Sequence, residues 1–268
     1  MWLNRPILMG AQKIKRFRDI KEIDEWLVQD FLNLTQSVLS TRKTFYLALS
    51  GGNTPKSLFT LLANKKHKVA AQIPWKNIQV FWVDERYVDA KSEENNFFVA
   101  NELLFKKLSI PKQNLHRIHT VSRIAAFSAR SYEKVLETLF SLGEDALPVF
   151  DLVWLGMGND GHTASIFPGS PLATHAASHA FVRDNLVVAT WVEKLQQTRI
   201  TLTPKVLRNA DAIRISVVGE EKASVLRQVL FGPRDHRKYP VQIVSDANED
   251  KVIWLIDRAA GKLLAPLA

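Results

Sequence analysis

Short apolar runs alternate with longer amphipathic stretches along this chain. Runs rich in β-branched and aromatic residues predict buried strands, because such side chains pack well on a pleated surface. The runs of this kind are Thr44–Leu49, Ile78–Val83, Phe150–Leu155, Leu186–Thr190, Arg199–Leu202, Ile213–Val218 and Val252–Asp257. We expect a strand at each of them.

Between these runs, apolar residues recur at the three- and four-residue spacing that is typical of amphipathic helices. Pro55 lies where the first such helix begins, since its missing N–H costs nothing in a first turn. Thr203, followed by Pro204, is expected to cap a later helix. The helices predicted in this way are Ser57–Leu62, Asn95–Leu108, Arg123–Leu142, Lys205–Asn209 and Lys222–Leu230.

This alternation predicts an α/β fold with a doubly wound, mainly parallel sheet flanked by helices, of the Rossmann-like kind. The sequence shows no internal repeat and no Pro-rich or Gly/Ser-rich linker, so we expect residues 1–268 to form a single domain. In such sheets ligands bind at the carboxyl ends of the strands. The distinctive polar residues of this chain directly follow predicted strands, and we therefore treat them as one site.

The composition excludes several classes of protein. There is no cysteine among the 268 residues, which excludes a disulfide scaffold and a thiolate zinc site. Residues 1–6 contain no long apolar run, and no stretch approaches the roughly 20 apolar residues of a membrane helix. We therefore expect a cytoplasmic protein that does not bind a membrane.

The net charge of +9 is compatible with nucleic-acid binding, with a basic surface of no specific role, or with a pocket for a phosphorylated metabolite. The basic residues are scattered, and neither a long polybasic block nor an aromatic-basic repeat is present. This distribution argues against a nucleic-acid partner and leaves the other two interpretations open.

The segment Ser50–Pro55 has the character of an anion site. Gly51 and Gly52 follow a predicted strand and precede a helix, so backbone N–H groups and the positive end of the helix dipole can meet an anion there. Asn53 and Thr54 add side-chain donors. The segment lacks the spacing of a P-loop or of a dinucleotide fingerprint, so neither ATP nor NAD is favoured. An ordinary strand-to-helix turn is the alternative.

The sequence Asp84-Glu85-Arg86-Tyr87 follows the next predicted strand. The planar guanidinium of Arg86 suits a phosphate or carboxylate, and Asp84 is positioned in sequence to hold it. On the surface the same residues would form only a weak salt bridge.

The segment Gly156–Ser165 carries the strongest chemical signal. Its three glycines allow backbone to approach a ligand closely, and Asp160 precedes His162 by two residues. Histidine is the side chain best suited to general base catalysis near neutral pH, and a nearby carboxylate can orient it. We predict His162 and Asp160 as catalytic residues rather than as parts of a structural loop.

Other chemistries fit less well. Asp160 and His162 have no further metal ligand nearby at suitable spacing, and His175 and His179 lack the glutamate of a metalloprotease helix, so we expect no metal. A serine hydrolase is disfavoured because the G-x-S-x-G elbow is absent.

Two further cations lie at predicted element boundaries. Arg199 begins a strand, and Lys222 begins a helix shortly after Gly219. Either can meet a phosphate, although taken singly each fits an ordinary solvated cation better.

In their order, these motifs resemble the 6-phosphogluconolactonase family, part of the glucosamine-6-phosphate isomerase/6-phosphogluconolactonase group. The stretches that carry the resemblance are Leu49–Pro55, Trp82–Arg86, Asn95–Asn96, Gly156–Gly169, Arg199–Thr203 and Gly219–Lys222. Two departures are mild: Asn53 stands where serine is common, and residues 193–198 lack the prolines often found before Arg-Ile-Thr.

The related glucosamine-6-phosphate deaminases are the alternative. Their pattern has tyrosine at the position of Arg86 and a ring-opening glutamate at the position of Phe167. Phenylalanine cannot relay a proton, so both positions favour the lactonase over the amino-sugar deaminase.

The resemblance implies hydrolysis of 6-phosphoglucono-δ-lactone to 6-phosphogluconate without a cofactor. It implies that His162 acts as general base beside Asp160, and that the phosphate is bound by residues of the motifs above. These residues are Gly51, Gly52, Asn53, Thr54, Arg86, Arg199 and Lys222. We expect a monomer or weak homo-oligomer, and a non-catalytic sugar-phosphate sensor is the third possibility.

Overall fold

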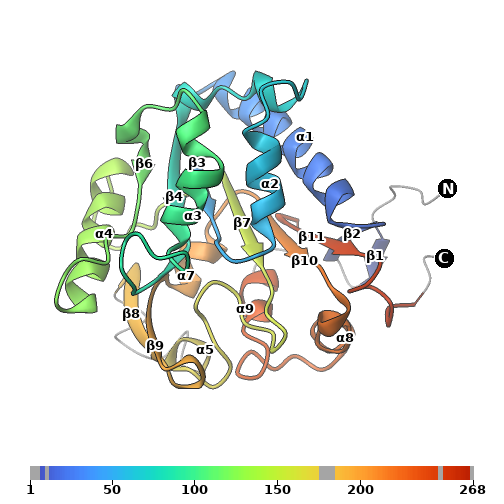
Figure 1. The fold of residues 1–268 in the computed structure, drawn as a ribbon. Helices are drawn as coiled ribbons and strands as arrows, with labels where there is room; N and C mark the ends of the chain where they lie inside the picture. Colours follow the sequence, from blue (N-terminus) through green and yellow to red (C-terminus); the bar gives the residue numbers. More distant parts are fainter. Residues whose placement is uncertain (1–6, 10–11, 175–184, 247–249, 266–268) are drawn as a thin grey trace.

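The computed structural model describes residues 7–9, 12–174, 185–246 and 250–265. His175 and His179, which were considered as a metal pair, lie outside these residues. Within the described ranges, a central sheet runs in the order β1-β2-β11-β10-β7-β3-β4-β6 (Figure 1). Its strands are β1 (Ile7–Met9), β2 (Gln12–Phe17), β11 (Val252–Asp257), β10 (Ile213–Val217), β7 (Leu152–Gly156), β3 (Phe45–Leu49), β4 (Ile78–Trp82) and β6 (Leu115–His116).

The pairing in this sheet is parallel throughout, apart from the antiparallel pair of β1 and β2. The predicted doubly wound, mainly parallel α/β sheet is therefore confirmed. The central strands β3, β4 and β7 read as nearly continuous apolar runs, because strands covered on both faces have no solvent side.

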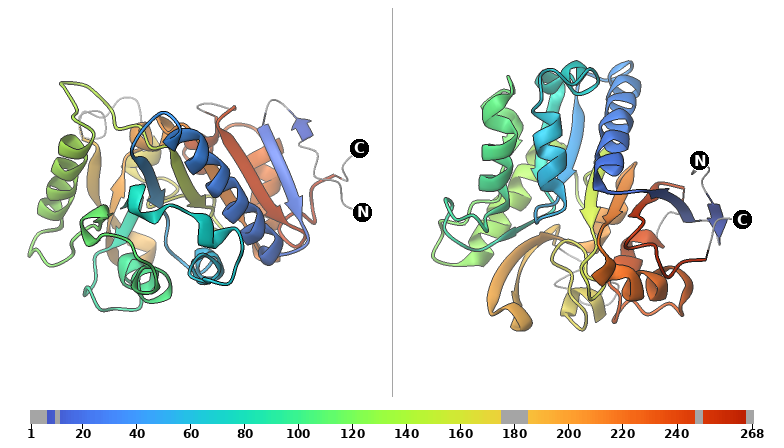
Figure 2. Two further views of the ribbon diagram at one scale, coloured as in Figure 1. Left: turned by 90° about the horizontal axis from the view of Figure 1, so that it is seen from above. Right: turned by 45° about the vertical axis from the view of Figure 1, so that its right-hand side comes forward.

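Helices cover both faces of the sheet. On one face, α1 (Ile20–Leu39), α2 (Pro55–Leu62) and α3 (Asn96–Leu103) pack in series, and on the other, α7 (Pro204–Arg208) packs against α9 (Val241–Ser245) (Figures 1 and 2). The remaining helical segments are α4 (Ala125–Leu139), α5 (Pro171–Thr174), α8 (Ala223–Phe231), η1 (Ala70–Gln72), η2 (Trp75–Asn77), η3 (Phe105–Lys107), η4 (Lys112–Asn114), η5 (Glu193–Leu195) and η6 (Glu220–Lys222). None of the described helices is both long and apolar enough to traverse a lipid bilayer.

The core is built from aromatic side chains between sheet and helices. Phe31 of α1 is fully buried and meets Phe45, Trp75 and Trp154 edge-on, with ring centroids 5.1–5.7 Å apart. Such edge contacts stabilise a core beyond the area that they bury. They fix α1 against β3 and β7, the strands that lead into the glycine turns described below.

The segments Leu186–Thr190 and Arg199–Leu202 are strands, as predicted, but they do not join the parallel sheet. They belong to β8 (Val187–Val192) and β9 (Gln197–Leu202), which pair antiparallel with β5 (Asp84–Arg86) in a separate three-stranded sheet. Two strands joined by a short turn can only pair antiparallel. Because β5 follows β4 after a single residue, this small sheet lies at the carboxyl edge of the large one.

Several elements differ from their predicted form. No element was predicted before residue 44, yet β2 and the 20-residue α1 lie there; Asp19 caps α1 and accepts from Glu22 N. The helix expected over residues 222–230 begins as the 3₁₀ turn η6 and continues as α8. Thr203 occupies the cap position of α7, but its hydroxyl donates to the carbonyls of Asn185 and Leu186 instead of capping.

Candidate active site

A cavity of about 650 Å³ lies at the carboxyl ends of β3, β7 and β10, where the small sheet meets the large one. Its wall is drawn from segments far apart in the sequence. Every predicted substrate-binding residue contributes to the wall: Gly51, Gly52, Asn53, Thr54, Arg86, Arg199 and Lys222. His162 also lines it, whereas Asp160 lies behind the histidine and is not part of the wall.

The turn after β3 forms one end of the cavity. A Cβ on Gly51 would lie 1.9 Å from Asn96 Oδ1, so glycine is required for the turn to pass Asn96. The helix α2 begins at Pro55, and Thr54 at its cap makes no side-chain capping bond. Lys56 N donates to Asn53 O at 3.3 Å, and the positive end of the α2 dipole faces the cavity, which favours an anion there.

The two arginines lie side by side in the small sheet. Arg86 of β5 is the register partner of Arg199 of β9. Arg86 donates from Nη1 to the carbonyl of Glu94 at 2.8 Å, and the Nε atoms of both arginines are buried without a hydrogen-bond partner among the described residues. Burial, and then the charge of Arg86, lowers the pKa of Arg199. Two crowded guanidinium groups with unused donors form a site that suits an anion.

The expected pairing of Asp84 with Arg86 is absent from the hydrogen bonds of the described residues. Asp84 Oδ2 instead accepts from Ser165 Oγ at 2.6 Å, which ties β5 to the loop after β7. Asp84 is only 6% exposed and lines the cavity. The prediction was wrong because the partner of Asp84 comes from a segment that sequence proximity does not indicate.

Glu85 faces away from the cavity and has a structural role. Its carboxylate accepts from the backbone N–H groups of Arg86, Asn96 and Phe97, and so closes the start of α3. Burial raises the pKa of Glu85 to about 7, although these hydrogen bonds act in the opposite direction.

The loop after β7 places His162 in the cavity wall. A Cβ on Gly158 would lie 2.1 Å from the imidazole of His162, so the ring lies directly over this glycine. The loop is closed by two hydrogen bonds: Gly158 N donates to His162 O at 2.9 Å, and Thr163 Oγ1 donates to Gly156 O at 2.8 Å. Ala164 adopts a left-handed conformation with φ of 48°, a strained backbone for a residue with a side chain.

Asp160 orients the imidazole of His162. Its Oδ1 lies 2.5 Å from His162 Nδ1 and also accepts from His162 N at 3.2 Å. Burial would raise the pKa of Asp160, but the hydrogen bonds and charges of His162 and Lys194 outweigh it and hold the pKa well below its usual range. Asp160 is therefore ionised near neutral pH. An ionised Asp160 favours the tautomer with the proton on Nδ1, which leaves Nε2 as an acceptor toward the cavity.

Phe167 covers one face of the His162 ring. Its phenyl ring stacks on His162 with centroids 4.3 Å apart and planes 29° apart. Phe167 also lines the cavity. The position offers no ionisable group to relay a proton to or from His162.

Lys222 lies in η6, after β10, and lines the cavity. Its backbone N–H donates to Gly219 O at 3.2 Å, and its ammonium forms no hydrogen bond to a described residue. Burial lowers its pKa, while the charges of Glu221 and Asp257 raise it. Glycine at 219, with φ of 102°, leads the chain into η6, and its N–H donates to Asp257 at 3.2 Å. The ammonium of Lys222 can therefore bind an anion in the cavity as a point charge.

The metal interpretation of Asp160 and His162 has little support from the geometry. Within the described part of the chain, no group of three histidine, aspartate or glutamate side chains lies close enough to hold a metal ion.

Some cavity residues were missed by the sequence analysis. Asp24 of α1 lines the cavity and is 5% exposed, and burial raises its pKa to about 6. The signal was a lone acid on the apolar face of a helix, beside Ile20 and Ile23. Leu195, a wall residue at the tip of the β8–β9 hairpin, was missed, as was its neighbour Lys194, which lies outside the wall and contacts Asp160. Only the folded hairpin brings these two residues to the loop that carries His162.

Comparison with known proteins places the chain among sugar-phosphate enzymes. Residues 18–254 match the family model described as glucosamine-6-phosphate isomerases/6-phosphogluconolactonase. The chain is 36% identical to a 6-phosphogluconolactonase of Synechocystis, over 82% of this chain and 85% of that one. It is also 36% identical to a 6-phosphogluconolactonase of Haemophilus influenzae, over 82% of this chain and 87% of that one.

Solved structures give the same grouping. The fold is similar to the crystal structure of 6-phosphogluconolactonase from Thermotoga maritima, with a TM-score of 0.73 and 28% identity over 91% of this chain and 98% of that one. A monomeric glucosamine-6-phosphate deaminase, 19% identical, shares the fold with a TM-score of 0.73 over 94% of this chain and 100% of that one. The chain belongs to the glucosamine-6-phosphate isomerase/6-phosphogluconolactonase family.

Proposed function

We propose that this chain hydrolyses 6-phospho-D-glucono-1,5-lactone to 6-phospho-D-gluconate, a step of the oxidative pentose phosphate route. The observation that carries the proposal is the oriented His162–Asp160 pair, which shares one cavity with a separate set of anion-binding groups. The identity to relatives named 6-phosphogluconolactonase supports the same substrate.

His162 acts as the general base in this proposal. Its free Nε2 removes a proton from water as the water oxygen attacks the lactone carbonyl, and a tetrahedral intermediate forms. The bond from the carbonyl carbon to the ring oxygen then breaks, and the imidazolium returns its proton to the leaving oxygen. Water supplies the hydroxyl of the new acid, so the reaction needs no oxidant or reductant and no redox cofactor.

Backbone N–H groups of the glycine-rich loop after β7 are the proposed donors to the oxyanion of the intermediate, apart from Gly158 N, which donates to His162 O. Asp160 stabilises the imidazolium that forms on His162, because its ionised carboxylate lies against Nδ1.

The phosphate is proposed to bind at the other end of the cavity. Gly51, Gly52, Asn53 and Thr54 supply N–H and side-chain donors at the start of α2, and Arg86, Arg199 and Lys222 supply positive charge. Binding energy at this remote group holds the carbonyl carbon near His162, which lowers the entropic part of the barrier.

Phe167 argues against a deaminase. The ring-opening role ascribed to a glutamate at this position needs a group that can exchange a proton with His162, and the stacked phenyl ring has none. Ammonia release from glucosamine 6-phosphate is therefore expected to be absent.

The test follows hydrolysis of lactone freshly made by oxidising glucose 6-phosphate, with spontaneous ring opening subtracted. The wild-type protein is expected to accelerate acid release, and folded His162→Asn is expected to lose about 10²-fold or more in kcat. Near-normal turnover by His162→Asn would remove His162 from the role of base. Tight binding of the sugar phosphate without any turnover by the wild type would identify a sensor instead.

Non-phosphorylated glucono-1,5-lactone is the matched control substrate. Arg86→Ala is expected to weaken the reaction of the phosphorylated lactone and to spare that of the control. Equal losses on both substrates would contradict a phosphate role for Arg86. The single domain over residues 1–268, the monomeric or weakly associated state and the cytoplasmic location stay predictions.

A further inference from the structure

The tip of the β8–β9 hairpin reaches the catalytic loop. The hairpin turns through η5 and through Gln196, which has a left-handed φ of 48°. Hydrogen bonds fix both sides of the tip: Trp191 Nε1 donates to Glu193 at 2.7 Å, and Gln197 Nε2 donates to Glu94 at 2.8 Å. The turn is therefore held in place, and it presents Lys194 and Leu195 to the site.

Lys194 contacts the acid that orients His162. Its Nζ lies 3.1 Å from Asp160 Oδ2, while Asp160 Oδ1 lies 2.5 Å from His162 Nδ1. One carboxylate oxygen of Asp160 therefore contacts the Lys194 ammonium, and the other contacts the His162 ring. Leu195, the next residue, is part of the cavity wall.

We infer that Lys194 is a positioning residue for the reaction, one that fixes the carboxylate of Asp160 and opposes protonation of His162. The inference rests on the proposed role of His162 as general base. A carboxylate alone beside Nδ1 favours the imidazolium, which is useless as a base. The ammonium on the second oxygen partly cancels that field, which favours the neutral ring that can act as a base.

The other charges around the site do not explain the same effect. The charged side chains on the cavity wall are Asp24, Asp84, Arg86, Arg199, Glu221 and Lys222. None of them is hydrogen-bonded to Asp160 or His162, and all remain when Lys194 is changed. A difference between wild type and a Lys194 variant therefore reports the Lys194 charge itself.

The expected effect is moderate because the Lys194 side chain is 65% exposed and water screens its charge. In Lys194→Met, the acid limb of the plot of kcat/KM against pH is expected to move to higher pH by about half a unit. Lys194→Arg keeps the charge and is expected to restore the wild-type limb. Lys66→Met removes the same charge from an exposed site outside the cavity wall and is expected to leave the profile in place.

Ionic strength provides a second test of the role of Lys194. Raising salt screens the Lys194 charge, so the acid limb of the wild type is expected to move toward that of Lys194→Met, while the variant moves less. A purely structural role for Lys194 would lower the rate at every pH by the same factor and leave the limb unmoved.

NMR titration of the His162 ring separates this inference from the proposed function. The ring signal, assigned by its loss in His162→Asn, is expected to titrate at higher pH in Lys194→Met than in wild type, with or without turnover. An unchanged titration, or an unmoved acid limb in an active and folded Lys194→Met, would overturn the inference. Absence of lactone hydrolysis by the wild type, together with a shifted titration, would overturn only the function.

Discussion

The space beside Gly158 is occupied by the ring of its neighbour His162. The sequence indicated only that the glycines of this loop let backbone approach a ligand. In the folded protein, the atoms nearest to a Cβ at position 158 would be ring atoms of His162, at 2.1 Å. Gly158 therefore determines where the catalytic ring can lie, as well as how the backbone turns.

Gly158→Ala is expected to displace the His162 ring and to lower kcat by about 10²-fold, since small displacements of a catalytic group are costly. Steady-state kinetics on the phosphorylated lactone checks this, with KM expected to change little because the phosphate groups lie elsewhere. Gly143→Ala, where a Cβ meets nothing within 4 Å, is the matched control. Similar kcat values for both variants would contradict the steric role of Gly158.

Single residues were predicted better than their partners. His162, Arg86 and Lys222 were chosen because titratable groups after predicted strands converge at one edge of a parallel sheet, and they do line one cavity. Their partners depend on contacts between distant segments: Ser165 for Asp84, and the carbonyl of Glu94 for Arg86. No spacing rule in the sequence encodes such contacts.

At the scale of elements, the catalytic loop rests on the connection between α8 and α9. Val241 N donates to Gly161 O at 3.0 Å, and Gly169 N donates to Arg237 O at 2.9 Å. A Cβ on Gly161 would lie 2.9 Å from the Tyr239 ring. The connection therefore supports the loop on both sides of His162.

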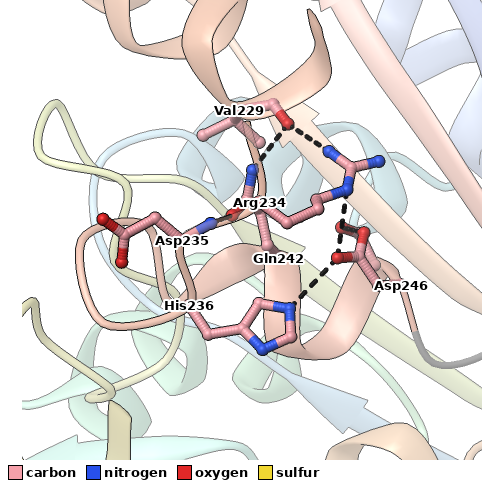
Figure 3. Close-up of polar contacts among 7 residues, drawn as sticks. Val229, Arg234, Asp235, His236, Gln242 and Asp246 are labelled. Atoms are coloured by element: carbon pink, nitrogen blue, oxygen red, sulfur yellow. Dashed lines mark hydrogen bonds and ion pairs between the residues drawn. The ribbon is translucent and has the colours of Figure 1, made fainter. Parts of the chain in front are cut away.

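Gln242 holds this connection in place (Figure 3). Its amide donates to Val229 O and accepts from Asp235 N, each at 2.9 Å, and the residue is fully buried. In the same connection, Asp246 Oδ2 lies 3.2 Å from Arg234 Nε and 3.1 Å from His236 Nε2 (Figure 3). The buried amide links the end of α8 to the start of the supporting segment.

Gln242→Leu is expected to lower the free energy of unfolding by about 1–3 kcal/mol, because Asp235 N loses its acceptor and the Val229 carbonyl keeps only the bond from Arg234. Urea unfolding followed by circular dichroism measures the change. Gln29→Leu, at an exposed position of α1, should cost far less. A similar loss of unfolding free energy in the two variants would show that the side-chain hydrogen bonds of Gln242 contribute no more than those of an exposed glutamine.

Strands were predicted more reliably than their places in a sheet. A continuous apolar run predicts burial on both faces, so the central strands were found. The same runs do not reveal whether a segment pairs in the large sheet or, as β8 and β9 do, in the small one. The N-terminal helix α1 was missed although Asp19 and the recurring Ile23, Leu27 and Phe31 carry its pattern.

For the molecule as a whole, a buried histidine remote from the cavity is expected to contribute to acid sensitivity. His116 lies in the edge strand β6, stacks on Phe81 with centroids 4.5 Å apart, and shares a 2.6 Å hydrogen bond with Gln79. Burial lowers the pKa of His116 to about 4. The unfolded chain takes up this proton at about pH 6.5.

A folded-state pKa below the unfolded one gives stability that is present above about pH 6.5 and is lost as pH falls toward about 4. We therefore expect His116→Gln to lose less unfolding free energy between pH 7 and pH 5 than the wild type loses. Urea midpoints at the two pH values measure this. Asp24 and Glu85 titrate in both proteins and cancel in the comparison. Equal losses of unfolding free energy in the wild type and in His116→Gln would exclude His116 as a source of acid sensitivity.

The place of β2 in the sheet has a consequence for the order of folding. β2 pairs with β1 on one side and with β11 on the other, so the strand at residues 12–17 depends on the strand at residues 252–257. During synthesis, β2 emerges early and has no neighbour in the parallel sheet until nearly all of the chain has followed it. Helix α1, which follows β2 at once and carries Asp24, contacts β11 as well. The pairing of β2 with β11 is therefore expected to form late, after β3 and β4 have paired and α1 has packed on α2 and β3.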